Sequence, residues 1–493
     1  MKTLKTVVAL ADILYRNLDE DDPGQSIWAP YFWEEGKFRG ENNLFILSKE
    51  HLEMLFHREF PVDKPYWGIN LWNMLKHSSS YEILPVHFGV HTVWKDFDFM
   101  TYVEAHRDGR KYIVPVVACD PGRFSDWYKG NAKLPEEVLE DVKTGKATLV
   151  IECPWEGNHT RPEDIDNFDR WIEREGLGDC KDRIWYLTNV LGGKICDYLK
   201  APERKFRYRG TPFFEELPWG GMPGGWVRTY RGDGKDGFLE RADVLEEYID
   251  SKAYSFDKKF LALFGSIREH RLFLYGFINT HTNLRETSIV SLRNNYDCWD
   301  LLSNPNSYER VFIRGIDEGV DKFIEELGST EEQDDHRILV EKDTGDLYSV
   351  YKQPIRDRCC IELITETGYG LNDCIAFTEK TFKGILSKKP FILVGGSYGV
   401  LKTLRSLGYE TFGDFWDESY DLIEDPKERL KAVGKLLLDI DKHYSLEDLK
   451  DLKKQMKPIL DHNFNLMVNS QRFRNTIRWY STLCVEKKWT KFV

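Results

Sequence analysis

The chain has 493 residues, 41% hydrophobic and 31% charged, so it is too long for one core and we expect two or three domains. Its formal net charge of −13 argues against a protein whose whole surface binds nucleic acid, and no stretch approaches the roughly 20 apolar residues of a membrane span. The nine cysteines are scattered without a Cys-x-x-Cys pair, which indicates neither a zinc site nor a disulfide framework and predicts a reduced, cytoplasmic protein.

The first 150 residues have the pattern of a mixed α/β region. Apolar runs predict strands at residues 44–47 and at residues 112–117. Asp96 and Asp98 have the spacing of a metal-binding Asp-x-Asp motif. We interpret them as surface carboxylates, because this spacing arises by chance in a chain with 82 acidic residues.

A β-α-β unit follows, and its first loop carries polar residues. Residues 148–151 predict a buried strand that leads directly into Glu152 and then Glu156, which is followed by a glycine. A helix is expected from Arg161 to near Gly176, and the next strand at residues 184–189. Because active sites of α/β proteins lie at the carboxyl ends of parallel strands, Glu152 and Glu156 are candidate catalytic residues.

Two later regions are rich in polar residues, and two are locally basic. Glycines and prolines within residues 200–240 predict a loop excursion, and residues 300–337 read as an acidic connecting region. The stretch 200–209 is basic, and residues 451–493 hold nine Lys and Arg against three acids. These two basic stretches predict a local positive patch on an acidic protein.

A second α/β region begins with a strand predicted at residues 259–264. The strand leads into Arg268, His270 and Arg271, and a helix then continues through Asn279. Cations at the N-terminus of a helix favour an anion, and a diphosphate has the right chemistry. The sequence therefore predicts a phosphate site at this turn.

Residues 374–399 combine a charged pair with a strand and a glycine turn. Thr378 is a predicted N-cap, and Glu379 and Lys380 open the helix that follows it. Residues 391–394 predict a buried strand, and the Gly-Gly-Ser-Tyr-Gly turn at 395–399 opens the way to another helix. We expect the nucleotide part of a ligand to bind here, against the helix N-termini.

The remaining elements complete this half of the chain. Short strands are predicted at residues 288–292, 348–351 and 360–366. A helix is expected at residues 401–407, and the chain is predicted to be largely helical from Pro426 onward.

Three segments between residues 260 and 430 together resemble one enzyme family. They are FGSIREHR, LITETGYG with FTEKTFKGILSKKPFILVGG, and LKTLRSLGYETFGDFWDESYD. The combination resembles a group of glycosyltransferases found in phages, large viruses and marine bacteria, which is distantly similar to the α-1,3-fucosyltransferases and exostosins. This sequence departs from the group at Ile267, where proline is common, and in the glycine turn at 395–399.

The resemblance implies an α/β fold of the GT-B type, with two Rossmann-like domains facing across a cleft and a helical C-terminal extension. It places an acceptor-side domain at residues 1–255 and a nucleotide-sugar-binding domain at 256–450. Helices at 451–493 then return towards the first domain.

The resemblance also implies roles for the residues that match the group's motifs. Arg268 or Arg271, in the cluster with His270, would meet the diphosphate of a UDP- or GDP-linked sugar donor, and Lys380 would add a second positive charge. Glu379 would accept hydrogen bonds from ribose or sugar hydroxyls. The donor site shows no carboxylate cluster suited to Mg²⁺ or Mn²⁺, so we expect transfer without a metal.

The leading hypothesis is therefore transfer of a sugar from a nucleoside diphosphate sugar to a hydroxyl, with Glu156 or Glu152 as the general base. One acceptor class is a hydroxymethylated base of viral DNA, which would use the two basic stretches. The other class is a glycan, a lipopolysaccharide or a protein. A third hypothesis is a catalytically inactive GT-B protein that serves in interactions.

Overall fold

The structure of the protein is a computed structural model. It describes residues 6–10, 97–101, 106, 107, 109, 111–117, 134, 136–153, 160–212, 215, 226–230, 238–265, 267–292, 304–329, 350, 351, 354–367, 369 and 374–469. The strand predicted at 44–47 and the candidate base Glu156 lie outside the described residues, as do residues 470–493.

The first half of the chain forms a six-stranded sheet in which every strand pair is parallel. Its order is β2-β1-β3-β4-β5-β6. The strands are β1 (Thr6–Leu10), β2 (Phe97–Thr101), β3 (Tyr112–Val117), β4 (Ala147–Cys153), β5 (Ile184–Thr188) and β6 (Arg207–Gly210). The prediction at 112–117 matches β3, and the buried strand predicted at 148–151 is the centre of β4.

The helices of this half are amphipathic segments that cover the sheet. They are α7 (Glu136–Thr144), α8 (Pro162–Arg174), the 3₁₀ helix η4 (Gly178–Arg183) and α9 (Lys194–Leu199). Ile165, Phe168 and Ile172 of α8 recur at helical spacing and are fully buried or nearly so, which explains why this segment is helical and which face it turns inward. The helix predicted from Arg161 is thereby confirmed.

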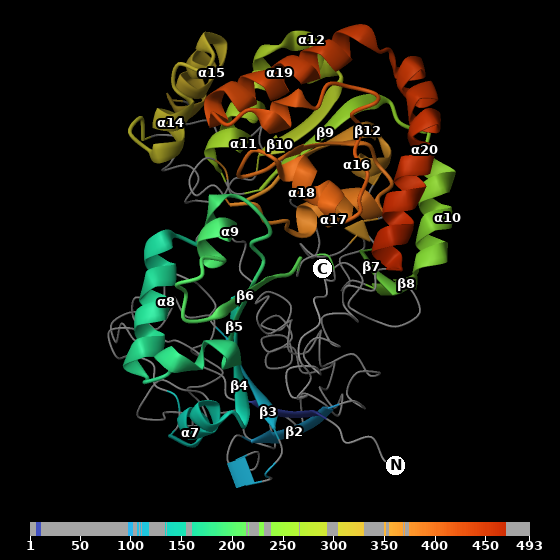
Figure 1. Cartoon of the computed structure of the whole chain (residues 1–493). Coiled ribbons are helices and arrows are strands. Elements are labelled where there is room, and N and C mark those ends of the chain that lie inside the picture. Colours follow the sequence, from blue (N-terminus) through green and yellow to red (C-terminus); the bar gives the residue numbers. More distant parts are fainter. Residues whose placement is uncertain are drawn as a thin grey trace, which may run out of the picture.

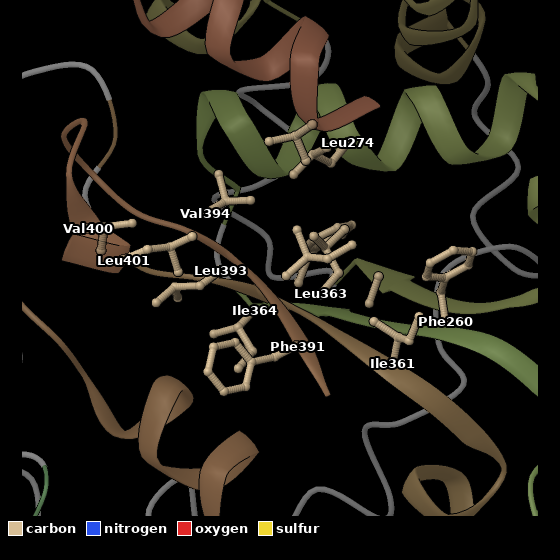
Figure 2. Close-up of a cluster of buried hydrophobic side chains, with 14 of the residues drawn as sticks. Phe260, Leu274, Ile361, Leu363, Ile364, Phe391, Leu393, Val394, Val400 and Leu401 are labelled. Atoms are coloured by element: carbon tan, nitrogen blue, oxygen red, sulfur yellow. The ribbon is translucent and has the colours of Figure 1, made fainter. Parts of the chain in front are cut away.

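The second half of the chain forms a four-stranded parallel sheet with the order β10-β9-β12-β13. Its strands are β9 (Lys258–Phe264), β10 (Ser288–Leu292), β12 (Cys359–Thr365) and β13 (Phe391–Val394). β10 and β13 have the predicted bounds. Figure 2 shows apolar side chains of β9, β12 and β13 in one cluster with Leu274 of α11 and Leu401 of α18.

Helices surround this second sheet (Figure 1). They are α10 (Ala242–Lys252), α11 (Glu269–Thr280), α12 (Thr282–Glu286), α14 (Tyr308–Ile313), α15 (Glu318–Ser329), α16 (Pro354–Asp357), α17 (Glu379–Leu386), α18 (Val400–Ser406), the 3₁₀ helix η7 (Ser419–Leu422), α19 (Pro426–His443) and α20 (Leu446–Val468). α20 continues through Pro458 and lies beside α10 (Figure 1). Among the described residues, none of the helices has both the length and the apolar composition needed to cross a membrane.

Two polar regions contain more regular structure than predicted. Residues 200–240 hold β6 and an antiparallel pair, β7 (Trp226–Tyr230) and β8 (Phe238–Arg241), to which the short β11 (Val350–Tyr351) adds a third strand. The loop prediction is wrong for these strands, whose aromatic and β-branched residues outweigh the nearby glycines. The glycine-rich segments at 216–225 and 231–237 lie outside the described residues. Residues 300–337 hold α14 and α15, whose Ile313 and Val320 are buried in the core that includes α11.

The two sheets meet at their carboxyl edges. Leu191, just beyond β5, donates its backbone N–H to the carbonyl of Ile375 over 2.7 Å, and Asn189 Nδ2 donates to the carbonyl of Phe377 over 2.9 Å. Ile375 and Phe377 precede α17, whose N-terminus lies at the carboxyl edge of the second sheet. The predicted fold class, an α/β protein with two Rossmann-like sheets in a GT-B-like arrangement, is confirmed by these two parallel sheets.

Candidate functional site

The second sheet has a topological switch point between β9 and β12. From β9 the chain goes to the edge strand β10 and later returns to β12 on the other side of β9. In open parallel sheets, ligands bind outside the carboxyl ends of the two strands that flank such a point. The turn after β9 carries Arg268, His270 and Arg271, which the sequence singled out.

Two of these three side chains join the turn to the end of β12. Arg271 donates from Nε to Thr365 Oγ1 over 3.2 Å and from Nη2 to the carbonyl of Thr365 over 3.1 Å. His270 Nε2 lies 2.8 Å from the carbonyl oxygen of Glu366. Both side chains are buried, so the turn has a defined geometry before any ligand arrives.

His270 is not a cation, contrary to its expected place in a cationic cluster. Its burial, reinforced by the charge of Arg271, lowers its pKa well below the ordinary value. The ring is therefore neutral at pH 7. Since a carbonyl oxygen can only accept, the proton lies on Nε2, and Nδ1 is left buried with no hydrogen-bond partner among the residues that the structure describes.

A third arginine that sequence analysis missed reaches the same place. Arg429 of α19 is 4% exposed and donates from Nη1 to the carbonyl of Ile423 over 2.7 Å. Its guanidinium lies 4.9 Å from the ring of Tyr369, which stacks on His270 at 4.8 Å. The charges of Arg271, Arg268 and Arg429 all lower the pKa of His270, as expected of guanidinium groups that lie near it.

Two of these arginines lack an acidic partner. Among the described residues no carboxylate forms an ion pair with Arg268 or Arg429, and the Nε of each is buried without a hydrogen-bond partner. Arg268 is also the N-cap of α11, and its side chain does not cap the first amides of that helix. The amide dipoles and the arginines act in the same direction and favour an anion.

One nearby carboxyl group compensates this charge incompletely. Glu269 is 2% exposed, and burial together with the charge of Glu309 raises its pKa to about 7, against the opposite influence of a hydrogen bond from its own backbone amide and of the charges of Arg268 and Arg271. Near neutral pH a substantial fraction of Glu269 is therefore uncharged. The site keeps an excess of positive charge.

Glu379 and Lys380 open α17 close to this turn. Thr378 caps the helix as predicted and accepts a hydrogen bond from the amide of Lys380 over 3.4 Å. Lys380 Nζ lies 2.8 Å from Glu379 Oε1, with the Lys380 side chain 27% exposed and that of Glu379 only 5%. Burial would raise the pKa of Glu379, but the charges of Lys380 and Lys383 keep it below the ordinary value, so the pair is ionised.

Glu366 connects the two predicted segments, and sequence analysis had placed it only as a strand end. Its carboxylate accepts from the amide of Thr378 over 3.0 Å, from Thr378 Oγ1 over 2.5 Å and from Thr381 Oγ1. Its carbonyl oxygen accepts from His270. The end of β12 thus fixes the α11 turn on one side and the α17 turn on the other.

The glycine turn before α18 has a different environment. Asp421 is 2% exposed and accepts hydrogen bonds from the amides of Leu401 and Lys402 over 3.1 and 3.3 Å. Gly399 adopts a left-handed φ of 80° at the N-cap position, where a Cβ would be strained. Because an internal carboxylate already accepts from the first amides of α18, those amides are not free to bind a nucleotide, and the nucleotide site expected here stays a prediction.

Of the two candidate general bases, the structure describes the backbone of Glu152 but not Glu156. Glu152 belongs to β4, where it pairs in register with Val117 of β3 and Leu187 of β5, and does not stand in the loop where it was predicted. The strand is longer than its apolar run because parallel neighbours on both sides continue the hydrogen bonding. Glu156 lies outside the described residues, so its role stays a prediction.

The basic stretch at 200–209 is largely neutralised within the protein. Arg204 Nη1 lies 2.7 Å from both Asp166 Oδ1 and Asp169 Oδ2 of α8. Lys205 pairs with Glu173 at 2.8 Å, and Arg207 pairs with Asp182. Arg204, Lys205 and Arg207 are therefore not free to form a positive patch.

The part of the chain that the structure describes contains no group of three or more His, Cys, Asp or Glu side chains placed to bind a metal ion. The six-residue run at 154–159, which includes Glu156, is not part of that description.

Comparison with known proteins gives low similarity. No protein-family model and no curated protein matches the sequence. Similar solved structures include an α,α-trehalose-phosphate synthase (UDP-forming) from Burkholderia vietnamiensis, with 10% identity over 83% of this chain and 84% of that chain and a TM-score of 0.32. The α,α-trehalose 6-phosphate synthase from Burkholderia multivorans has 10% identity over 84% of each chain and a TM-score of 0.33. Because these TM-scores are low, the likeness carries no argument about activity.

Proposed function

We propose that this protein is a glycosyltransferase that moves a sugar from a nucleoside diphosphate sugar to a hydroxyl acceptor. The observation that carries the proposal is the group of Arg268, Arg271 and Arg429 around the N-terminus of α11, at the switch point of the second sheet. A departing nucleoside diphosphate gains negative charge as the glycosidic bond breaks. Fixed guanidinium groups and helix amides at that place stabilise the transition state more than the ground state.

The remaining donor residues take the roles that their geometry allows. Lys380 is partly exposed and adds a second positive charge for the diphosphate, while its partner Glu379 accepts hydrogen bonds from ribose or sugar hydroxyls. His270 is a buried neutral group, so it positions the turn against Glu366 and does not supply charge. We propose UDP- or GDP-linked donors and transfer that persists in the presence of a chelator.

We propose that the first sheet binds the acceptor and that Glu156, with Glu152 as the alternative, is the general base. Two acceptor classes are to be compared: a hydroxymethylated base of DNA, and a glycan, lipopolysaccharide or protein. The ion pairs of Arg204, Lys205 and Arg207 favour the second class, because cations already neutralised by acids contribute little to phosphate binding. An inactive GT-B protein would bind donors without transfer.

Calorimetry with UDP, GDP and their sugar conjugates tests the donor site. Arg268→Ala and Lys380→Ala should each weaken nucleotide affinity by about one to two decades, the effect of losing one charge-assisted contact of roughly 1.5–3 kcal/mol. Arg405→Ala is the matched control, since Arg405 is an exposed α18 residue paired with Glu418 and should leave affinity unchanged. Unchanged affinity in both site variants, with the fold intact, would refute the donor site.

A transfer assay with the same donors separates an enzyme from an inactive protein. Glu156→Gln should keep donor affinity and lower turnover by roughly 10²–10⁴-fold if Glu156 is the base. Normal turnover in Glu156→Gln and in Glu152→Gln would exclude a protein base of this kind. Mass spectrometry of DNA nucleosides from cells with and without the protein distinguishes a DNA acceptor from the other class.

A further inference from the structure

A continuous series of aromatic rings runs from the surface of α14 to the candidate site. Tyr308 is 45% exposed, and its ring centroid lies 6.0 Å from that of Phe312 on the next turn of α14. Phe312 meets Tyr369 edge-on at 6.4 Å, and Tyr369 stacks on His270 at 4.8 Å. The rings therefore connect an exposed tyrosine to the turn that carries the arginines.

Tyr308 is also within electrostatic reach of the same turn. Burial and the charges of Glu269 and Glu309 raise the pKa of Tyr308 to about 12. Glu269 is the residue after Arg268, and the charge of Arg268 in turn acts on Glu269. α14 packs beside α11 (Figure 1), and its Phe312 reaches His270 in the first turn of α11 through Tyr369. Tyr308 thus stands at the rim of the arginine group.

The exposed face of Tyr308 is not covered by the apolar core. Val311, one turn along α14, is 50% exposed on the same face of the helix, whereas Phe312 behind it is partly buried and has Lys427 Nζ 5.5 Å from its ring centre. An exposed aromatic ring supported from behind loses little conformational freedom when a planar group stacks on it.

We propose that Tyr308 is the platform on which the nucleobase of the donor stacks. The inference rests on the proposed function, because a diphosphate held by the arginines carries its ribose and base on one side. Among the described residues, Tyr308 is an exposed aromatic ring linked to that turn through Phe312 and Tyr369. Every base has a π-face, so the platform serves UDP- and GDP-linked donors alike.

The test is calorimetry with three probes: UDP, GDP and inorganic pyrophosphate, which has the two phosphates but no base. Tyr308→Ala should weaken UDP and GDP binding by about 5- to 100-fold, the effect of losing one base–aromatic stack, while pyrophosphate affinity stays the same. Tyr308→Phe should retain nucleotide affinity. Tyr254→Ala is the control, because Tyr254 is also exposed, at 36%, but lies beside Lys453 and Lys454 of α20.

Each outcome has a separate meaning. If the wild-type protein binds neither pyrophosphate nor nucleotide, the proposed function itself fails. If it binds both and Tyr308→Ala leaves nucleotide affinity unchanged, the platform is refuted and the proposed function stands. Equal weakening of pyrophosphate and nucleotide in Tyr308→Ala also overturns the inference, since Tyr308 would then only support the arginine group.

Discussion

Two turns at the carboxyl edge of the second sheet lead from a buried strand into a helix, and their charges are compensated in opposite ways. The amides that open α18 are bound by the carboxylate of Asp421, which is buried. The turn before α11 instead has Arg268 as an N-cap whose side chain does not cap the helix, with Arg271 and Arg429 nearby. A glycine-rich turn that looks like a phosphate loop is thus already satisfied from within the protein. The turn with excess positive charge is the better anion site.

Among the substitutions that test this difference between the two turns, Arg271→Ala should have the largest effect on stability and nucleotide affinity. The variant loses two hydrogen bonds from a buried guanidinium to Thr365, and the truncation leaves a cavity between α11 and β12. We expect the free energy of unfolding to fall by roughly 2–4 kcal/mol and nucleotide affinity to fall at least tenfold. Urea denaturation and calorimetry measure the two effects.

Arg405→Ala supplies the control on the other turn. Its ion pair with Glu418 is partly exposed, so its loss should change the free energy of unfolding by at most about 1 kcal/mol. Equal losses of stability and affinity in the two variants would show that the α11 and α18 turns do not differ in the proposed way.

The second effect concerns pH and the acid beside the arginines. The pKa of Glu269 is raised from 4.5 to about 7 in the folded state, so the folded protein binds more protons than the unfolded chain between those values. The contribution of Glu269 to stability is therefore most favourable below pH 4.5 and is lost as the pH rises through 7. Glutamine does not titrate, so the Glu269→Gln variant does not lose this stability as the pH rises. Relative to the wild type, the variant should gain on the order of 2–3 kcal/mol between pH 5 and pH 8.

The affinity of the wild-type protein for an anion should also decrease as the pH rises. Because ionised Glu269 opposes an anion, the wild-type affinity for pyrophosphate should fall as the pH rises through 7, and that of Glu269→Gln should fall less. Denaturation curves and calorimetry at pH 5 and pH 8 measure both quantities. A stability difference between the two proteins that is the same at both pH values would contradict this prediction.

Local patterns in the sequence were sufficient for much of the second sheet. The apolar runs at 288–292 and 391–394 match β10 and β13, and Thr378 caps α17, because these features depend only on neighbouring residues. The cation-rich turn at Arg268 could also be found, since strand, turn and helix follow one another along the chain.

Features that depend on distant residues could not be predicted in the same way. Arg429 reaches the α11 turn from α19, and Asp421 reaches the amides of α18 from the later helix η7. The neutral state of His270 depends on burial under Tyr369 and on the surrounding arginines. The basic run around Arg204 was misread because its acidic partners lie on α8. That helix is in contact with the run in the folded protein but is far from it in the sequence.

The third prediction addresses the α18 turn directly. Asp421→Ala removes the carboxylate that satisfies the amides of Leu401 and Lys402, which should cost about 1–2 kcal/mol of stability, the usual effect of losing a helix cap. Nucleotide affinity should not change. A loss of nucleotide affinity larger than tenfold, with the fold retained, would return the α18 turn to the donor site.

The smallest effect should come from cations that are already compensated. The guanidinium of Arg207 is paired with Asp182, whose side chain is 79% exposed, and it also lies 5.6 Å from the ring of Trp185. Such an exposed pair contributes at most about 1 kcal/mol, so Arg207→Ala should barely change the free energy of unfolding. If the residue bound DNA phosphate, the variant would reduce the slope of log affinity against log salt by about 0.9 for that one contact. We expect an unchanged slope with duplex DNA in a salt titration. A reduced slope would show that an arginine paired with an acid inside the protein can leave that acid and bind a phosphate. Unpaired positive charge would then not distinguish the α11 turn from other parts of the protein.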